Sequence, residues 1–247
     1  MCESLNSFWY KDRSFLKSSH LKIIACLAMF LSHLAQGSLI YNLGYTKTAD
    51  LFMLIGRISM PLFSFMVCQG MSLSRDKKSY IKRLFIFALI SEIPYDLSFR
   101  GNFLDFYSQN VIFTLFLGSL LIYTWQYLDE KNINSYINIF IKFLIFWIIA
   151  YISIITRTDY DFKGIIAISL LYLARKNRYL TALAILVSFY FSAYVSGHEL
   201  YIPFMVYLSI PFVLLYNGQK GSYSKWGFYI FYPGHLLLIY LLNTILF

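Results

Sequence analysis

Ionisable side chains interrupt otherwise apolar stretches of this sequence, and they are the residues best suited to chemistry. His33 ends the stretch LKIIACLAMFLSH, eleven residues after Lys22. A histidine can act as a general base near neutral pH, and a nearby cation or amide can stabilise an oxyanion. The others are Arg57 in LIGRISMP, Glu92 and Asp96 in LISEIPYD, and His235 in FYPGHLLL.

The composition places these residues in a membrane. Of the 247 residues, 59% are hydrophobic and only 13% are charged, whereas a soluble domain carries about 25% charged residues. The mean hydropathy of +0.60 agrees, and no polar stretch is long enough to form a separate soluble unit. We therefore expect an all-α, polytopic bundle of transmembrane helices that forms one domain over residues 1–247.

Apolar segments of about the 20 residues that span a bilayer recur along the chain. Residues 1–20 mix aromatic and cationic side chains, which is typical of a short interfacial helix. We expect neither a signal peptide nor a disulfide or metal site from the spacing of the cysteines. The sequence predicts nine spans, near residues 21–40, 50–73, 80–98, 110–128, 134–155, 162–175, 180–196, 199–216 and 226–246.

The distribution of lysine and arginine predicts the orientation. With nine spans, the basic loops SRDKKSYIKR and ARKNR and the cations before the first and last spans fall on one side. The positive-inside rule makes that side cytoplasmic, so the N-terminus is expected inside and the C-terminus outside the cell membrane. The net charge of +9 then reflects topology, and we expect no nucleic-acid partner.

The predicted helices bring several ionisable groups to related depths. His33 lies roughly 16 Å beyond Lys22 along a helix, near the bilayer midplane, and Glu92 and His235 reach a similar depth. Arg57 enters from the other side, and it could instead form a structural ion pair with Glu92. Ionisable groups at such depths mark functional sites by default.

Two prolines, Pro61 and Pro94, are expected to break helical hydrogen bonding near these groups. Broken helices and polar groups at depth fit either a transporter or an enzyme with a sequestered site. Inverted repeats are common in transporters, and none is visible in this sequence, which favours catalysis slightly.

Several stretches of the chain resemble the TraX family of membrane proteins, named after a conjugative-plasmid protein that N-acetylates pilin. They are LKIIACLAMFLSH, IGRISMPLFSFMVCQG, RLFIFALISEIPYDL, NVIFTLFLGSLLIY, DYDFKGIIAISLLY, LLYNGQKG and FYIFYPGHLLLIYLL. The family usually has an aspartate before the first histidine, where this chain has Ser32. The missing carboxylate could be supplied by Glu92 or Asp50 from another helix.

A more remote similarity concerns the first span. Many integral-membrane acyltransferases carry an arginine, ten residues and then a histidine, and Lys22 and His33 reproduce that spacing with lysine in place of arginine. Together the two resemblances imply a transmembrane acyltransferase with acetyl-CoA as its cosubstrate. They imply a cationic mouth for the phosphates on the cytoplasmic side, formed by Lys22, Arg75, Lys78, Lys82 and Arg83, with Lys82 and Arg83 favoured because they begin a helix.

The implied reaction has a base and an oxyanion-stabilising group. We favour His33 as the base over His235, and direct transfer and an acetyl-histidine intermediate are both compatible with the sequence. Arg57 or the amides of Asn110 and Gln69 would stabilise the oxyanion, and Glu92 and Asp96 complete the predicted catalytic and substrate-binding set.

The resemblance implies an acceptor in or across the membrane, such as the N-terminus of a membrane-associated or exported peptide. A cell-surface glycan as acceptor, a transporter, and a non-catalytic partner in peptide maturation stay open as alternatives. Related membrane acyltransferases often pair, so a homodimer is one expectation.

Overall fold

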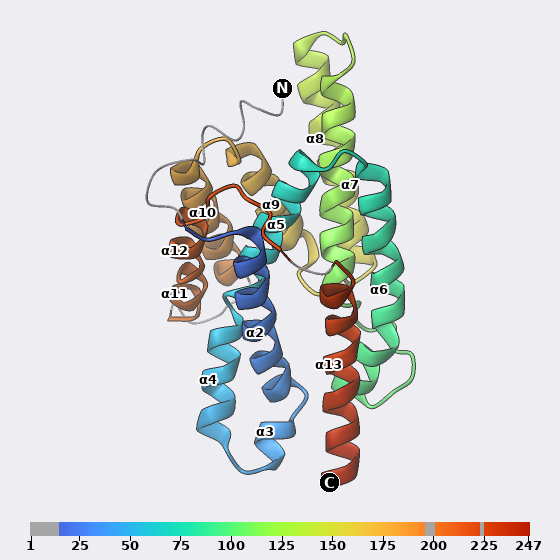
Figure 1. Ribbon diagram of the computed structural model, residues 1–247. Helices are drawn as coiled ribbons and strands as arrows, with labels where there is room; N and C mark the ends of the chain where they lie inside the picture. The colour runs from blue at the N-terminus through green and yellow to red at the C-terminus, as the bar shows by residue number, and fades with distance from the viewer. Residues whose placement is uncertain (1–14, 196–200, 223–224) are drawn as a thin grey trace.

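The structure, a computed structural model, describes residues 15–195, 201–222 and 225–247 and is almost entirely helical in those ranges (Figure 1). The only other pairings described are two isolated bridges, Leu16 with Tyr216 and Gln109 with Thr158. The helices are α2 Ser18–Gln36, α3 Leu39–Asn42, α4 Thr46–Gly56, α5 Ser59–Leu73, α6 Lys77–Arg100, α7 Val111–Asp129, α8 Ser135–Ile155, α9 Asp161–Ala174, α10 Arg178–Val195, α11 Tyr201–Tyr207, α12 Ser209–Leu214 and α13 Lys225–Leu246.

The all-α polytopic bundle is confirmed, and each predicted span contains helix. Six stretches are long and apolar enough to cross a membrane: α2, α4 with α5, α7, α8, α10 and α13. The helices α6, α9 and the pair α11–α12 occupy the other three predicted spans, so the count of nine stays a prediction. The predicted interfacial segment falls mostly outside the described residues, and its last three residues belong to the first turn of α2.

The second span is broken in its middle, as Pro61 predicts. Its pyrrolidine ring removes one backbone donor and clashes with the carbonyl four residues earlier, at Arg57. The helix accordingly ends at Gly56 and restarts at Ser59. The expectation for Pro94 is wrong, because α6 runs without interruption through this residue from Lys77 to Arg100.

Close helix approach is permitted by glycines at two crossings. Gly56 of α4 packs directly on the Ser32 side chain of α2, and Gly118 of α7 packs on Ile168 of α9. Small residues let the backbones of membrane helices approach each other. An apolar cluster joins α6 and α13 through Leu84, Phe87, Tyr232 and Leu236.

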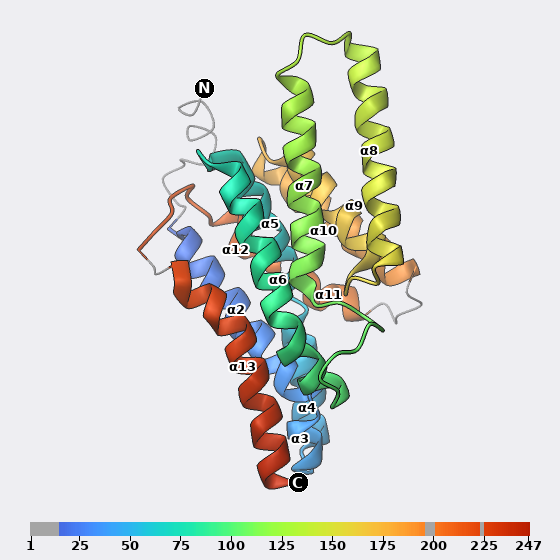
Figure 2. The same cartoon turned by 90° about the vertical axis from the view of Figure 1, so that its right-hand side faces the viewer.

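The turns that follow α5, α9 and α12 all lie toward the same end of the bundle (Figure 1). These are the turns that carry the basic loops of the predicted cytoplasmic side. The α7–α8 hairpin projects past the other helices at this end (Figure 2). The hairpin is displaced toward this end because α7 begins deep in the bundle, where its N-cap Asn110 is fully buried.

Candidate active site

Two histidines from opposite ends of the sequence meet inside the bundle. The Nδ1 atom of His33 lies 2.7 Å from the Nε2 atom of His235. Both side chains are buried, with 9% and 5% of their surface exposed. The packing of α13 against α2 places the two rings nearly in parallel planes, 11° apart. The histidines therefore lie at one level of the bundle, as their positions in the sequence predict.

The hydrogen bonds around the pair assign the hydrogens of two neutral rings. The Nδ1 atom of His235 lies 2.7 Å from the carbonyl oxygen of Phe231, which only accepts, so this nitrogen carries the hydrogen. The Nε2 atom of His235 is then an acceptor, and His33 donates to it from Nδ1. Neutral His33 is left with an unprotonated Nε2, whose lone pair can bind a proton or attack a carbonyl carbon.

Aromatic rings enclose the histidine pair. The ring of Phe99 on α6 meets His33 edge to face at 5.2 Å between centroids, and Tyr232 meets it at 6.0 Å. On the other side, His235 contacts the rings of Phe30 at 5.9 Å and Phe231 at 4.8 Å. These contacts come from α2, α6 and α13, so three helices hold the imidazoles in a fixed orientation.

Glu92 is held by the first residues of α7. Its Oε2 atom accepts hydrogen bonds from the backbone N–H of Asn110, at 3.2 Å, and from the Asn110 side-chain amide. The same amide donates to the Ala88 carbonyl, and its oxygen caps α7 by accepting from the Ile112 N–H. Asn110 thus positions Glu92 and caps the start of α7. These hydrogen bonds occupy all the polar atoms of the Asn110 side chain.

Asp96 lies one turn beyond Glu92 and is completely buried. Its Oδ2 atom accepts from the backbone N–H of Asp105 at 2.7 Å. The Oδ1 atom of Asp96 and the Oε1 atom of Glu92 have no hydrogen-bond partner among the described residues. A buried acceptor without a donor is costly, so these two oxygens require an explanation.

Tyr232 connects this acidic pair to the histidines, and the sequence reasoning did not select it. Its hydroxyl oxygen lies near the Val111 N–H and within electrostatic range of Glu92 and Tyr95. Its ring contacts His235 at 5.6 Å. The only signal in the sequence is its place three residues before His235 in FYPGH, which puts both on one face of a helix.

Arg57 does not form the predicted ion pair with Glu92. The ion pairs of the described residues are Arg100–Asp105, Lys142–Asp129 and Lys163–Asp161. The break after α4 instead directs the charge of Arg57 toward Asp159 and Tyr160, with which it interacts electrostatically. Arg57 therefore belongs to a separate polar cluster, and it has no described contact with the histidine pair.

Asp159 was also missed from the sequence, where it stands between two apolar runs in RTDYD. Two residues with positive φ, Arg157 at 51° and Asp161 at 45°, bracket its turn. Asp159 is exposed on the surface of this turn, although neighbouring protein atoms partly desolvate its carboxylate. This partial desolvation raises the pKa of Asp159 to about 6, while the charge of Arg57 lowers it.

Ser32, the residue at which the chain departs from the family pattern, faces away from the pair. Its hydroxyl donates to the Met29 carbonyl at 2.9 Å, and its side chain packs on Gly56. Neither Asp50 nor Glu92 replaces a carboxylate beside His33, because Asp50 accepts from the Tyr41 hydroxyl and Glu92 is held by Asn110. The partner of His33 Nδ1 is His235.

The predicted cationic mouth is only partly assembled. A cavity of about 330 Å³ lies between the turn before α6 and the last turns of α7. Its lining includes Arg75 and Lys78 from the predicted set, but not Lys82, Arg83 or Lys22. The Nζ atom of Lys22 instead lies 5.5 Å from the ring centre of Phe228. The other lining residues are Asp76, Lys77, Tyr123, Gln126, Tyr127 and Glu130.

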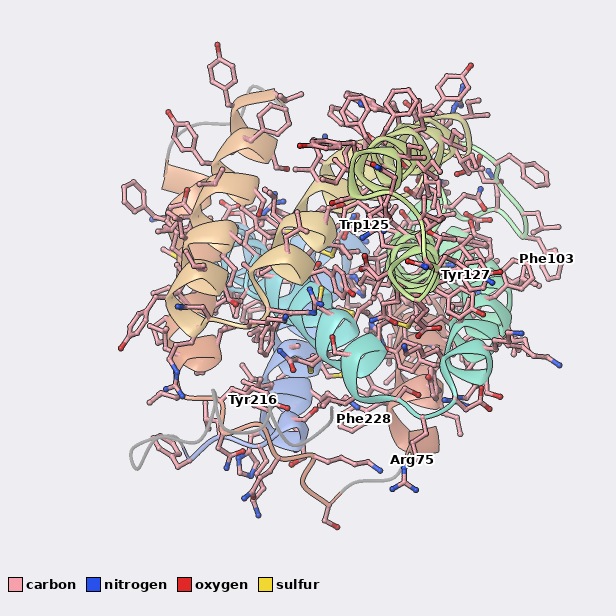
Figure 3. All side chains as sticks on the ribbon, turned by 90° about the horizontal axis from the view of Figure 1, so that it is seen from above. Arg75, Phe103, Trp125, Tyr127, Tyr216 and Phe228 are labelled. Carbon is pink, nitrogen blue, oxygen red and sulfur yellow. The ribbon has the colours of Figure 1, made fainter. Side chains whose placement is uncertain are left out.

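Two residues that line this cavity, Arg75 and Tyr127, are labelled in a view from above the bundle (Figure 3). The labelled Arg75 side chain points outward at the periphery, and Tyr127 stands on the neighbouring α7. Gln69, predicted to bind substrate, precedes Gly70, which is covered by the Tyr80 ring. Gln69 is therefore near the turn that leads to α6, and no described contact joins it to the histidine pair.

Comparison with known proteins identifies relatives of this chain. The family model described as TraX protein matches residues 17–243. A relative from Dichelobacter nodosus, named "Probable fimbrial assembly protein FimC, serogroup H1", is 27% identical over 238 residues, which cover 89% of this chain and 92% of the relative. No solved structure matches. The match includes both histidines and spans nearly the whole chain, and the chain therefore belongs to the TraX family.

Proposed function

We propose that this protein is an integral-membrane acetyltransferase that moves an acetyl group from cytoplasmic acetyl-CoA to an acceptor amine in or across the membrane. The observation that carries this proposal is the ordered chain from the Phe231 carbonyl through His235 to His33. It leaves the Nε2 atom of His33 unprotonated inside an aromatic enclosure, which is the form that a general base or nucleophile requires.

His33 acts on the acceptor as the new bond forms. The acceptor nitrogen attacks the thioester carbonyl carbon while Nε2 of His33 takes its proton, and the carbon–sulfur bond then breaks. The resulting imidazolium returns the proton to the departing thiolate. His235 accepts the Nδ1 hydrogen of His33 throughout, and thereby steadies the imidazolium as a carboxylate does in a catalytic triad.

Tyr232 is the candidate for stabilising the oxyanion. Its hydroxyl oxygen lies near the Val111 N–H, and a tyrosine hydroxyl can donate its own hydrogen to an oxyanion. The neighbouring N-terminus of α7 carries partial positive charge, which favours a developing anion. In this role Tyr232 replaces Arg57, Asn110 and Gln69, because Asn110 is fully occupied and the other two have no described contact with the pair.

Acetyl-CoA enters the proposal as a cosubstrate. The cavity beside Arg75, Lys77 and Lys78 offers cations suited to its phosphates. From Lys78 to Phe99, whose ring contacts His33, the distance along α6 is roughly 31 Å at 1.5 Å per residue. The pantetheine arm would have to enter the bundle between the helices for most of that distance to present the thioester to His33.

The acceptor that we favour is the N-terminus of an exported or membrane-associated peptide. The D. nodosus relative is named for fimbrial assembly, a process built on exported protein subunits. The basic turns at one end of the bundle support a cytoplasmic N-terminus and an outer C-terminus by the positive-inside rule. A cell-surface glycan as acceptor is the alternative outcome of the assay.

The test compares two histidines of α2. Purified protein in lipid nanodiscs is incubated with radiolabelled acetyl-CoA and a synthetic apolar peptide with a free N-terminus. We expect His33→Ala to abolish transfer and His20→Ala to leave it unchanged, because His20 is exposed at the start of the helix. Full transfer by His33→Ala, with both variants folded, would refute the assignment. Transfer to a glycan and not to the peptide would identify the alternative acceptor.

A further inference from the structure

The acidic pair on α6 contains two buried oxygens that nothing in the described structure satisfies. Glu92 uses Oε2 and Asp96 uses Oδ2 to accept hydrogen bonds, whereas Oε1 of Glu92 and Oδ1 of Asp96 accept none. Only 8% of Glu92 and none of Asp96 is exposed. Leaving a buried polar group unpaired costs about 1–3 kcal/mol, and more if it is charged, so a missing hydrogen-bond donor is the simplest account of both oxygens.

The two carboxyl groups lie on the helix face that leads to His33. They are four residues apart, which places them on one face of α6, and Phe99 follows Asp96 by three residues. The ring of Phe99 contacts His33 at 5.2 Å and that of Tyr95 at 5.0 Å. Tyr232 approaches Glu92 from α13 and also contacts His33. Phe99 and Tyr232 thus link the acidic pair to the proposed base, and a ligand bound to the pair would lie on the side of α6 that faces His33.

The charges around this pair are not balanced. Glu92, Asp96 and Asp105 face one guanidinium, that of Arg100. Arg100 already contacts Asp105 at 3.8 Å, donates to the Ser108 hydroxyl at 2.7 Å and covers the Tyr107 ring. Arg157 also covers the Tyr107 ring, at 5.6 Å, and has no described contact with Glu92 or Asp96. Arg57 interacts with Asp159, whose own charge is near Tyr95 and Tyr232. An added positive charge beside Glu92 and Asp96 would therefore be electrostatically favourable.

We propose that Glu92 and Asp96 form an acceptor subsite that binds a primary ammonium group and takes the first of the two protons that it loses in the reaction. A primary ammonium supplies N–H donors to both unpaired oxygens and a charge that balances one carboxylate. This inference rests on the proposed acetyl transfer and deepens it, because it assigns a group and a proton-transfer step to the acceptor.

The protons of the reaction balance under this assignment. An acceptor R–NH₃⁺ gives one proton to the carboxylate of Glu92 and becomes a nucleophilic amine. The amine forms the C–N bond while His33 takes the second proton, and the C–S bond breaks. His33 returns its proton to the thiolate, and Glu92 releases the other to water, so the sum is R–NH₃⁺ plus acetyl-CoA to R–NH–acetyl, CoA–SH and H⁺. A hydroxyl acceptor has no first proton to lose, so the subsite favours amines.

The experiment uses a pair of peptides whose acceptor groups differ in charge at pH 7. One synthetic apolar peptide has an ordinary N-terminal amine, which is protonated near neutral pH. The other has an N-terminal aminooxy group, which is uncharged at pH 7. Glu92→Gln and Asp96→Asn are compared with wild type and with Asp50→Asn, a control whose exposed carboxylate accepts from Tyr41.

At pH 7 we expect each of the two variants to lower kcat/KM for the amine peptide by about 100-fold and for the aminooxy peptide by less than about threefold. The Asp50 control should match wild type on both peptides. An equal loss on the two peptides would overturn the subsite, since it would mean that the carboxylates only maintain the structure.

A binding measurement separates this inference from the proposed function. The wild type should bind the free-amine peptide at least about tenfold more tightly than its N-formyl derivative, and both acidic-pair variants should remove that difference. If no peptide is acetylated but this difference is seen, acetyl transfer fails and the ammonium subsite stands. If the wild type binds both peptides equally, the ammonium subsite fails whatever the transfer assay shows.

Discussion

The Nδ1 atom of His33 and the Nε2 atom of His235 are 2.7 Å apart, although 202 residues separate them along the chain. One histidine is near the end of α2 and the other is in the middle of α13. Their contact means that neither helix can shift by a turn without breaking the pair. A test of His235 therefore also tests the orientation of His33.

Replacing His235 should impair catalysis without abolishing it. His235→Ala removes the acceptor for His33 Nδ1, so the His33 ring can adopt the wrong tautomer. We expect kcat to fall by about 100-fold or more, as it does when the orienting member of a triad is lost. The double variant with His33→Ala should be no worse than His33→Ala alone, because the two residues act as a unit. Additive losses in single-turnover assays would contradict this coupling.

Tyr232→Phe should lower the rate of the chemical step while keeping the aromatic enclosure. The ring contacts with both histidines remain, but the proposed oxyanion donor is lost, for which we expect a decrease of about 100-fold in kcat with little change in KM. Tyr229→Phe is the matched control, because its ring stacks on Phe87 away from the pair. A change confined to KM would instead assign Tyr232 to substrate binding.

Two groups of cations can be compared for binding of the cosubstrate. Arg75→Ala with Lys78→Ala should weaken CoA binding by about tenfold in titration calorimetry, with an effect that shrinks as salt is raised. Lys82→Ala with Arg83→Ala should change it less, because these side chains do not line the cavity. The opposite ranking would restore the sequence-based preference for Lys82 and Arg83.

The crossing of α2 and α4 offers a test of the fold itself. In Gly56→Ala the new methyl group meets the Ser32 side chain directly, and overpacking of this kind costs about 1–3 kcal/mol. We expect a lower melting temperature of the purified protein, and partial recovery when Ser32→Gly is added. Unchanged stability of Gly56→Ala would mean that the two helices are further apart than described.

Asp159 predicts a pH dependence of stability. Its pKa is about 6 in the fold against 3.8 for the isolated group, so the folded state holds more protons between these values. Stability contributed by this residue therefore falls as pH rises from about 4 to 6 and is level above that range. Asp159→Asn should be more stable than wild type at pH 7 to 8, and the difference should shrink toward pH 4. A constant difference across that range would contradict the raised pKa.

The sequence predicts the architecture better than the site. Apolar runs and the break at Pro61 are local features, and the helices follow them closely. Pro94 did not break α6, because a long helix packed on its neighbours can tolerate one lost hydrogen bond.

Side-chain contacts between distant helices depend on rotations that local pattern does not set. The residue types led correctly to two histidines at one level, but the partner of Arg57 could not be deduced, because the break after Gly56 redirects its side chain. Asp159 and Tyr232 were missed for a related reason. A turn held by Arg157 and Asp161 brings Asp159 near Arg57, and the buried start of α7 lies beside Tyr232. Neither feature has a signature in single residues.

The Phe231 carbonyl has a consequence for the energetics of the membrane. It ends the polar chain that starts at Nε2 of His33, and a helical carbonyl is not a proton carrier. A proton taken up by His33 thus finds no onward relay through His235 and must leave by the side from which it came. The histidine pair therefore does not conduct protons across the membrane, and acetyl transfer that uses it would not dissipate the proton gradient across the bilayer.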